Sequence, residues 1–125
     1  MLTIRQNQMR ALQKMVDNRF VASLNAYLRQ HYHRYVDKLS DDVLSRRIRK
    51  GLALARRYRM ESASSKALFI LLMFMVAPNF AFQPAIAEVL MRTDKSGDWR
   101  LRFLVNQVTK DHWLEAARSY DPNFW

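Results

Sequence analysis

An uninterrupted apolar segment from Ala67 to Ala77 constrains the fold more than any other part of the chain. Its eleven residues carry no polar side chain. As an α-helix, a segment of this length spans about 16 Å, roughly half the hydrocarbon core of a bilayer. It is therefore too short to cross a membrane, and protein must cover it. We expect a third helix over residues 64–76 that ends before Pro78 and lies at the centre of the fold.

The composition around this segment is typical of an all-α protein. The chain has 125 residues, of which only two are glycine and three are proline. Good helix formers such as Ala, Leu, Met, Arg and Gln are abundant. We predict a single-domain bundle of about five helices over residues 1–125, with the apolar helix in the middle.

The first helix is expected over residues 4–32, and it is the longest. Thr3 and Gln6 have the spacing of a capping box. Apolar side chains then recur at intervals of three and four, which predicts a single buried stripe. The stripe consists of Met9, Leu12, Val16, Phe20, Leu24, Tyr27, Leu28 and His31. The helix should form the spine of the bundle.

The second helix is expected to begin at Ser40 and to run to about Tyr58. Ser40 can cap the free amides, and Asp41 and Asp42 favour the positive end of the helix dipole. Its apolar residues gather within an arc of about 120°; they are Leu44, Ile48, Gly51, Leu52, Ala55 and Tyr58. Gly51 on this arc indicates the close approach of another helix, because glycine costs up to about 1 kcal/mol in a helix relative to alanine.

Two further helices are expected in the C-terminal third. Pro84 suits the first turn of a short fourth helix over residues 84–92. A fifth helix is expected over residues 98–120, with an apolar stripe at helical spacing. Its members are Leu101, Leu104, Val105, Val108, His112, Ala116 and Tyr120. Pro122 ends this helix, so residues 121–125 should form an exposed tail.

Candidate functional residues lie in a basic segment that directly precedes the apolar one. Residues 46–59 contain seven basic side chains and no acidic one, and the formal net charge of the whole chain is +10. Such a surface attracts anions, so an acidic protein partner is predicted. Aromatic residues of the tail can anchor an interface. The predicted partner-binding residues are Arg46, Arg49, Lys50, Arg56, Arg57, Arg59, Phe124 and Trp125.

Two other interpretations of the basic segment stay open. One is a solvated helix face with no partner. The other is nucleic-acid binding, with Tyr32, Tyr35 and Tyr58 available for base stacking. The nucleic-acid interpretation lacks a helix-turn-helix, zinc-finger or RNA-recognition signature. Binding to a membrane surface is less favoured, because the opposite face of the second helix contains Gly51 and Ala55 where large apolar residues would be needed.

Patterns that carry chemistry are not found in the sequence. His31 and His33 are two residues apart and would point in different directions on a helix, which makes a poor metal pair. Two glycines cannot build a phosphate-binding loop. We therefore expect no catalytic residue, no cofactor and no metal site, and the chain is not expected to be an enzyme.

Cysteine usage and the N-terminus bear on the compartment. The chain has no cysteine, which suits a reducing environment. Residues 1–6 lack the continuous apolar stretch of a secretory signal. A cytoplasmic location is therefore expected, with no transmembrane segment.

The chain resembles a family of small helical proteins that occur beside type VI secretion effectors and spike proteins in Gram-negative bacteria. The resemblance covers about residues 1–92. It depends on Gln8, Met9, Ala11, Leu12, Arg19, Phe20, Gly51, Leu52, Ala55, Tyr58, Leu72, Met73, Phe74, Pro78, Asn79, Phe80 and Pro84. The sequence departs from the family pattern after Pro84, where Ala85, Ile86 and Ala87 stand in place of an expected tryptophan.

The resemblance implies a non-catalytic accessory protein that binds an effector or a component of the delivery spike. It could act as an adaptor or chaperone before loading, or as an immunity protein against a toxin that acts in the cytoplasm. A basic inhibitor cannot imitate nucleic acid to block a nuclease. This charge argument favours the adaptor over immunity.

Overall fold

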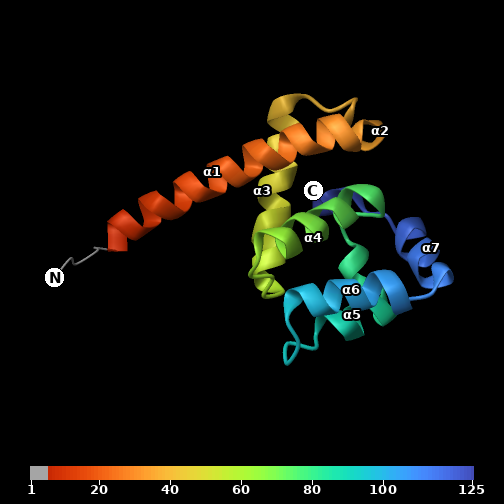
Figure 1. Cartoon of the computed structure of the whole chain (residues 1–125). Coiled ribbons are helices and arrows are strands. Elements are labelled where there is room, and N and C mark those ends of the chain that lie inside the picture. The colour runs from red at the N-terminus through yellow and green to blue at the C-terminus, as the bar shows by residue number, and fades with distance from the viewer. Residues whose placement is uncertain (1–5) are drawn as a thin grey trace. The chain divides into compact units, whose positions relative to one another are not determined.

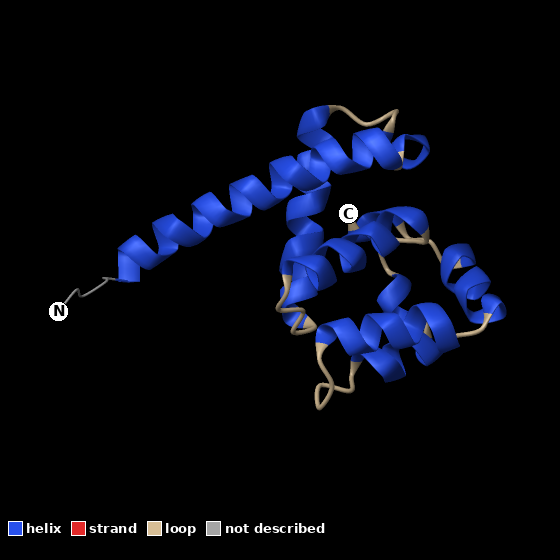
Figure 2. Ribbon diagram, viewed as in Figure 1, coloured by secondary structure: helices blue, strands red, loops and turns tan. Residues whose placement is uncertain are grey.

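The computed structural model describes residues 6–125 (Figure 1). Every regular element in this range is helical, which confirms the all-α class (Figure 2). The range contains seven α-helices and two 3₁₀ turns, where the sequence indicated about five helices. The predicted capping box at Thr3 and the predicted helix start at Ile4 involve residues outside the described ones.

The chain forms two compact units. The first ends at Ser45 and the second begins at Arg46. This boundary falls inside α3, which spans Asp41–Arg57. The sequence carries no signal for it, because no turn, glycine or proline interrupts the helix there. The two units are described in turn.

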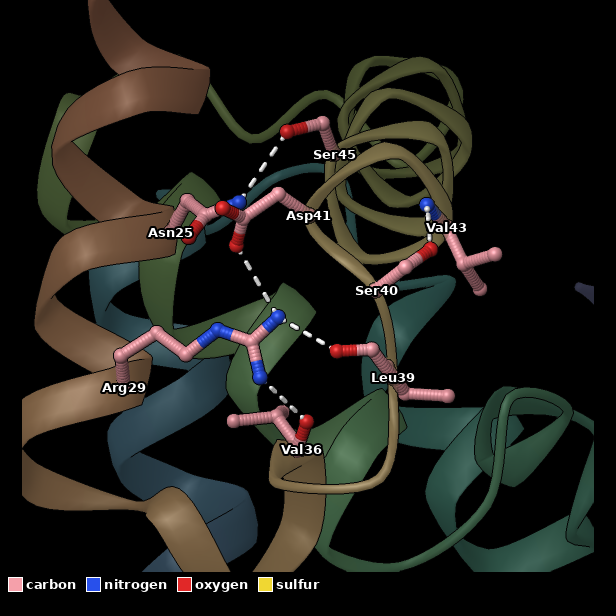
Figure 3. A network of polar contacts seen from close by, with 8 residues as sticks. All are labelled: Asn25, Arg29, Val36, Leu39, Ser40, Asp41, Val43 and Ser45. Atoms are coloured by element: carbon pink, nitrogen blue, oxygen red, sulfur yellow. Dashed lines mark hydrogen bonds and ion pairs between the residues drawn. The ribbon is translucent and has the colours of Figure 1, made fainter.

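The first unit contains α1 (Gln6–His31), α2 (His33–Val36) and the first turn of α3. The Arg29 guanidinium holds these elements together, as Figure 3 shows. It donates to the carbonyl oxygens of Val36 and Leu39 and forms an ion pair with Asp41 at 3.0 Å. The predicted cap of α3 is confirmed, because the amide of Val43 donates to the Ser40 hydroxyl at 3.2 Å.

The single apolar stripe expected along α1 is wrong. Leu24 and Leu28 are buried, but Leu12 and Val16 are 53% and 59% exposed. Leu12, Val16, Leu24 and Leu28 are separated by multiples of four residues, and each step of four advances about 40° around the helix. Leu12 and Leu28 therefore lie about 160° apart on α1, and Leu24 and Leu28 face the buried side.

The buried arc predicted for α3 is confirmed. Leu44, Ile48, Leu52 and Ala55 are at most 4% exposed. Gly51 is buried too, and a Cβ atom at this position would lie 2.9 Å from Cγ1 of Ile70. The missing side chain thus allows the close approach to α4 (Ala63–Met75) that its place on the apolar arc indicated.

Helix α4 carries the apolar segment. Its N-terminus is capped by Ser62, whose hydroxyl accepts from the amide of Ser65. Phe69, Ile70 and Met73 are almost fully buried, whereas Met75 is 41% exposed. Protein therefore does not cover the segment on all sides. The core that it joins consists of Ala55, Met60, Phe69, Leu72, Met73, Phe80, Ala81, Ile86, Val89, Leu90, Leu101, Leu104 and Ala116.

The remaining elements of the second unit pack around this core. They are the 3₁₀ turn η1 (Phe80–Phe82), α5 (Pro84–Leu90), α6 (Gly97–Gln107), α7 (Lys110–Arg118) and the 3₁₀ turn η2 (Pro122–Phe124). Helix α6 packs against both α4 and α5, while η1 packs against α5 and α7. Pro84 begins α5, as predicted.

The continuous fifth helix expected over residues 98–120 is wrong. The backbone of Val108 is extended, and Thr109 caps a new helix by accepting from the amide of His112. Threonine competes for backbone hydrogen bonds within a helix and favours the N-cap position. The predicted stripe is consequently divided between α6 and α7, and Val105 is left 54% exposed.

Arg100 on α6 is the largest buried polar side chain, at 1% exposure. Its guanidinium donates to the carbonyl oxygens of Tyr58 and Leu90 at 2.7 and 2.8 Å. Weaker bonds reach the carbonyl oxygens of Arg59, Lys95 and Ser96 at the same end of the unit. Burial, with a smaller effect from the cation of Arg59, lowers the pKa of this guanidinium.

Candidate protein-binding site

Five of the residues predicted to bind a partner lie on α3. At about 100° per residue, Lys50 and Arg57 lie within about 20° of each other, and Arg46 lies about 40° from Lys50. Arg49 and Arg56 lie about 100–120° away from Lys50. All five are exposed. They therefore share one arc of about 120°, with Lys50, Arg57 and Arg46 toward one edge and Arg49 and Arg56 toward the other.

Arg59 lies beyond the end of α3 and outside this arc. It follows the end of α3 with a φ angle of 58°, in the left-handed region. It lines a polar hollow of about 360 Å³ in which three carboxylates balance three cations; they are Glu61, Asp94 and Asp98, and Arg59, Lys95 and Arg100. Asp98 accepts from the Ser62 hydroxyl at 2.9 Å and so faces the N-terminus of α4. Because the charges that line this hollow balance one another, we interpret it as a structural feature of the fold and not as a binding site.

Lys50 and Arg57 stand at a second hollow, which is mostly apolar and has a volume of about 260 Å³. We call it the apolar hollow. Its apolar lining consists of Ala53, Leu54, Tyr58, Pro78, Ala81, Phe82 and Phe124, and its polar lining consists of Lys50, Arg57 and Asn79. No acidic side chain is among these lining residues. The hollow thus combines apolar walls with two cations.

The segment after α4 shapes one wall of the apolar hollow. Pro78 follows the end of α4, and η1 then turns Phe80 into the core and Phe82 outward. Phe80 is fully buried, whereas Phe82 is 57% exposed. The Phe82 ring contacts the Phe124 ring edge to face, with centroids 5.0 Å apart. Two aromatic rings from distant parts of the sequence therefore form one wall.

The C-terminal residues fold back onto the second unit, so the exposed tail expected over residues 121–125 is wrong. The Asn79 side chain donates to the carbonyl oxygen of Ser119 at 2.8 Å and accepts from the amide of Asp121 at 3.0 Å. Phe124 and Trp125 are both half-buried. An amide side chain at one position can satisfy backbone groups on both sides of a turn, and this fixes the path of the segment.

Trp125 lies in a packing contact and does not line the apolar hollow. Its ring contacts Phe74 with centroids 4.7 Å apart, and the Arg47 guanidinium lies 5.0 Å from its ring centroid. The Nε atom of Arg47 is buried without a hydrogen-bond partner. A cation over an indole ring is the strongest of the cation–π pairs, so Arg47 and Phe74 hold the chain end.

Tyr58 is the titratable group in the wall of the apolar hollow. It is half-buried, and its ring contacts Phe69 with centroids 5.5 Å apart. Burial raises the pKa of its phenol above the ordinary value. The hollow therefore favours neutral groups on its walls, while Lys50 and Arg57 favour anions beside it.

Most of the residues that line the apolar hollow were not among the predicted binding residues. Lys50, Arg57 and Phe124 were predicted separately, and the structure brings these three together. Phe82 was the one signal in the sequence for such a hollow. It is a large apolar residue between Pro78 and Pro84, where no regular helix or strand can bury it. Leu54 and Ala81 carried no signal, because each fits an ordinary helical or turn position.

Within residues 6–125, none of the helices is both long and apolar enough to cross a membrane. Within the same range, histidine and carboxylate side chains form no group of three or more that could hold a metal ion.

The chain was also compared with known proteins. No family model, no curated protein and no solved structure matches it.

Proposed function

We propose that the chain is a non-catalytic protein-binding accessory, and that the apolar hollow with Lys50 and Arg57 receives an acidic segment of its partner. One observation supports the proposal above all others. Lys50 and Arg57, from the basic segment, and Phe124, from the C-terminus, line a single hollow without an acidic residue. Aromatic side chains and arginine are the usual anchors of a protein interface.

The bound segment should combine one large apolar side chain with neighbouring carboxylates. The apolar side chain would fill the hollow between Leu54 and Phe82, where burial contributes about 1.5–3 kcal/mol. The carboxylates would contact Lys50 and Arg57, which adds specificity and speeds association. A hollow of about 260 Å³ is large enough for one such side chain and small for a drug-sized ligand.

The resemblance described above suggests which partner this is. Within a type VI secretion system, the partner would be a cognate effector toxin or a spike component. The accessory would hold it as an adaptor or chaperone, or neutralise it in the cytoplasm as an immunity protein. The basic charge favours the adaptor role, because it suits an acidic partner and excludes imitation of nucleic acid.

Nucleic-acid binding is the competing proposal, since exposed Arg46, Arg49, Lys50, Arg56 and Arg57 could contact phosphates. It predicts a steep loss of affinity with salt, because each neutralised phosphate releases counterions. A mobility shift of labelled DNA or RNA at low salt that disappears on salt addition would favour it. Binding to an acidic peptide with an apolar centre depends less on salt.

The test uses labelled peptides with a central Phe or Leu flanked by Asp and Glu. Matched peptides replace either the acidic residues by Asn and Gln or the central residue by Ala. Fluorescence anisotropy should show about tenfold weaker binding, or more, for each matched peptide. A bound peptide should also bury Tyr58 further, so the pKa of its phenol should rise on binding. The difference in alkaline titration between the wild type and Tyr58→Phe measures this rise.

Two double variants with the same change in net charge locate the binding site. Lys50→Glu with Arg57→Glu should weaken peptide binding about tenfold or more. Arg49→Glu with Arg56→Glu, at positions about 100–120° around α3 that do not line the apolar hollow, should change it less than about threefold. Circular dichroism checks that both proteins remain helical. Equal losses in the two variants would show that only net charge matters and would refute the site.

A further inference from the structure

Helix α1 has a second apolar face that the first unit does not cover. Its buried residues, Val21, Leu24 and Leu28, lie within about 60° of one another. Leu12, Met15 and Val16 lie on the opposite side and are 53%, 53% and 59% exposed. Three large apolar side chains exposed together on one helix face are typical of an interaction surface.

This outer face has the spacing of a coiled-coil seam. Its central line consists of Leu12, Met15, Arg19, Ala22 and Ala26, all of them exposed. Steps of three and four alternate along this line, which gives the average of 3.5 residues that keeps a seam straight against a partner helix. The line extends over about 21 Å, or about four turns. Ala22 and Ala26 would let a partner backbone come close.

The charge on α1 indicates the kind of helix that would fit. Arg19 lies in the middle of the seam, and residues 8–29 contain four basic side chains but one acidic side chain. A charged residue at a central seam position selects the partner that can neutralise it. A second copy in parallel register would place Arg19 against its own counterpart, and each copy carries a net charge of +10. An acidic helix avoids both conflicts.

We infer that the outer face of α1 binds an amphipathic helix of a partner protein, with an acidic residue of that helix pairing with Arg19. This surface shares no residue with the apolar hollow. Its occupation therefore does not depend on the function proposed above, and the two proposals can fail separately.

The experiment uses the full chain and a designed helical peptide of four heptads. The probe has Leu at its seam positions, except for one central Glu, and it has Glu at the positions that flank the seam. A small panel of such probes places the central Glu at each position of one heptad in turn. A basic probe with Lys in place of every Glu is the matched control. Anisotropy should show at least about tenfold preference for an acidic probe. Leu12→Gln with Val16→Gln should weaken that binding by about tenfold or more, because these variants remove the apolar contacts.

Charge reversal provides the decisive comparison. Arg19→Glu should weaken binding of the acidic probe, and a probe with its central Glu changed to Lys should restore binding to this variant. Lys14→Glu, on the opposite side of α1, makes the same change in net charge and should have little effect. Three outcomes would each overturn the inference. The first is equal binding of acidic and basic probes, and the second is an equal loss of binding in Lys14→Glu. The third is self-association of the chain that Leu12→Gln and Val16→Gln abolish. Circular dichroism should be unchanged, because the substituted side chains are exposed.

Discussion

Arg100 and Arg29 use their guanidinium groups in the same way, each within its own unit. Both donate to carbonyl oxygens at the ends of helices, where backbone acceptors lack partners within the helix. Arginine suits this task because its five donors form a rigid planar fork. In the sequence neither residue differs from an ordinary exposed arginine on a helix. Their roles depend on which carbonyl oxygens the fold brings near.

Arg100→Met should destabilise the protein by about 3 kcal/mol or more. Methionine keeps much of the apolar stem but leaves buried carbonyl oxygens without donors, and each such group costs about 1–3 kcal/mol. Urea unfolding followed by circular dichroism measures the change. Arg102→Met, two residues away on the exposed side of α6, is the matched control and should change the stability by less than about 0.5 kcal/mol. If Arg100→Met unfolded at the same urea concentration as the wild type, the hydrogen bonds of Arg100 would contribute little to stability.

Among the elements, the sequence predicted helix starts from capping and proline signals, and the structure has helices there. Helix ends that lie inside long periodic segments were not predicted. Ser40 and Pro84 begin helices as their side chains predict. Val108 and Thr109 interrupt a segment whose apolar spacing is continuous. Periodicity alone cannot distinguish one long helix from two helices that meet at an angle, because the apolar residues face a common core in both cases.

The contact between α3 and α4 makes Gly51 sensitive to substitution. Gly51→Ala should destabilise the protein by about 1 kcal/mol, because overpacking by about 1–3 kcal/mol outweighs a gain in helix propensity of up to about 1 kcal/mol. The added Cβ would meet Cγ1 of Ile70 and Sδ of Met73, at 2.9 and 3.1 Å. Denaturant unfolding is the measurement.

A second substitution separates packing from propensity. Gly51→Leu should cost clearly more than Gly51→Ala, although leucine is also a good helix former. Ala53→Gly, on the exposed side of the same helix, should cost about 1 kcal/mol from propensity alone. If Gly51→Ala were stabilising, Ile70 and Met73 would have room to move and the helix contact would be looser than the distances indicate.

For the whole molecule, a net charge of +10 on 125 residues implies repulsion within the folded state. Arg29 pairs with Asp41 and Arg92 pairs with Asp94, and both acidic partners are exposed. Such pairs contribute about 0–1 kcal/mol each and cannot offset the excess of cations. The uncompensated charge is what makes an acidic partner favourable at both proposed surfaces.

The midpoint of urea unfolding should therefore rise with salt. The Debye length falls from about 30 Å at 0.01 M to about 10 Å at 0.1 M ionic strength, so repulsion between the cations is screened. Titration with sodium chloride at neutral pH measures the effect. A midpoint that fell with added salt would mean that attractive pairs dominate. The variant with Lys50→Glu and Arg57→Glu lowers the net charge by four and should show a smaller rise.

How far the sequence predicts this protein depends on the distance over which each feature acts. Residues near one another in the sequence determined the helical class, the cap at Ser40, the helix start at Pro84 and the buried arc of α3 on which Gly51 lies. These follow from propensity, capping and periodicity, which act within a few residues along the chain.

Only the tertiary structure decided which side chains meet across the fold. The return of the C-terminus depends on Asn79, which is 40 residues from Ser119 in the sequence. The apolar hollow depends on Lys50, Phe82 and Phe124 coming together from three separate segments. The two faces of α1 differ because the fold covers one and leaves the other exposed. Long-range packing sets all three, and no local pattern encodes it.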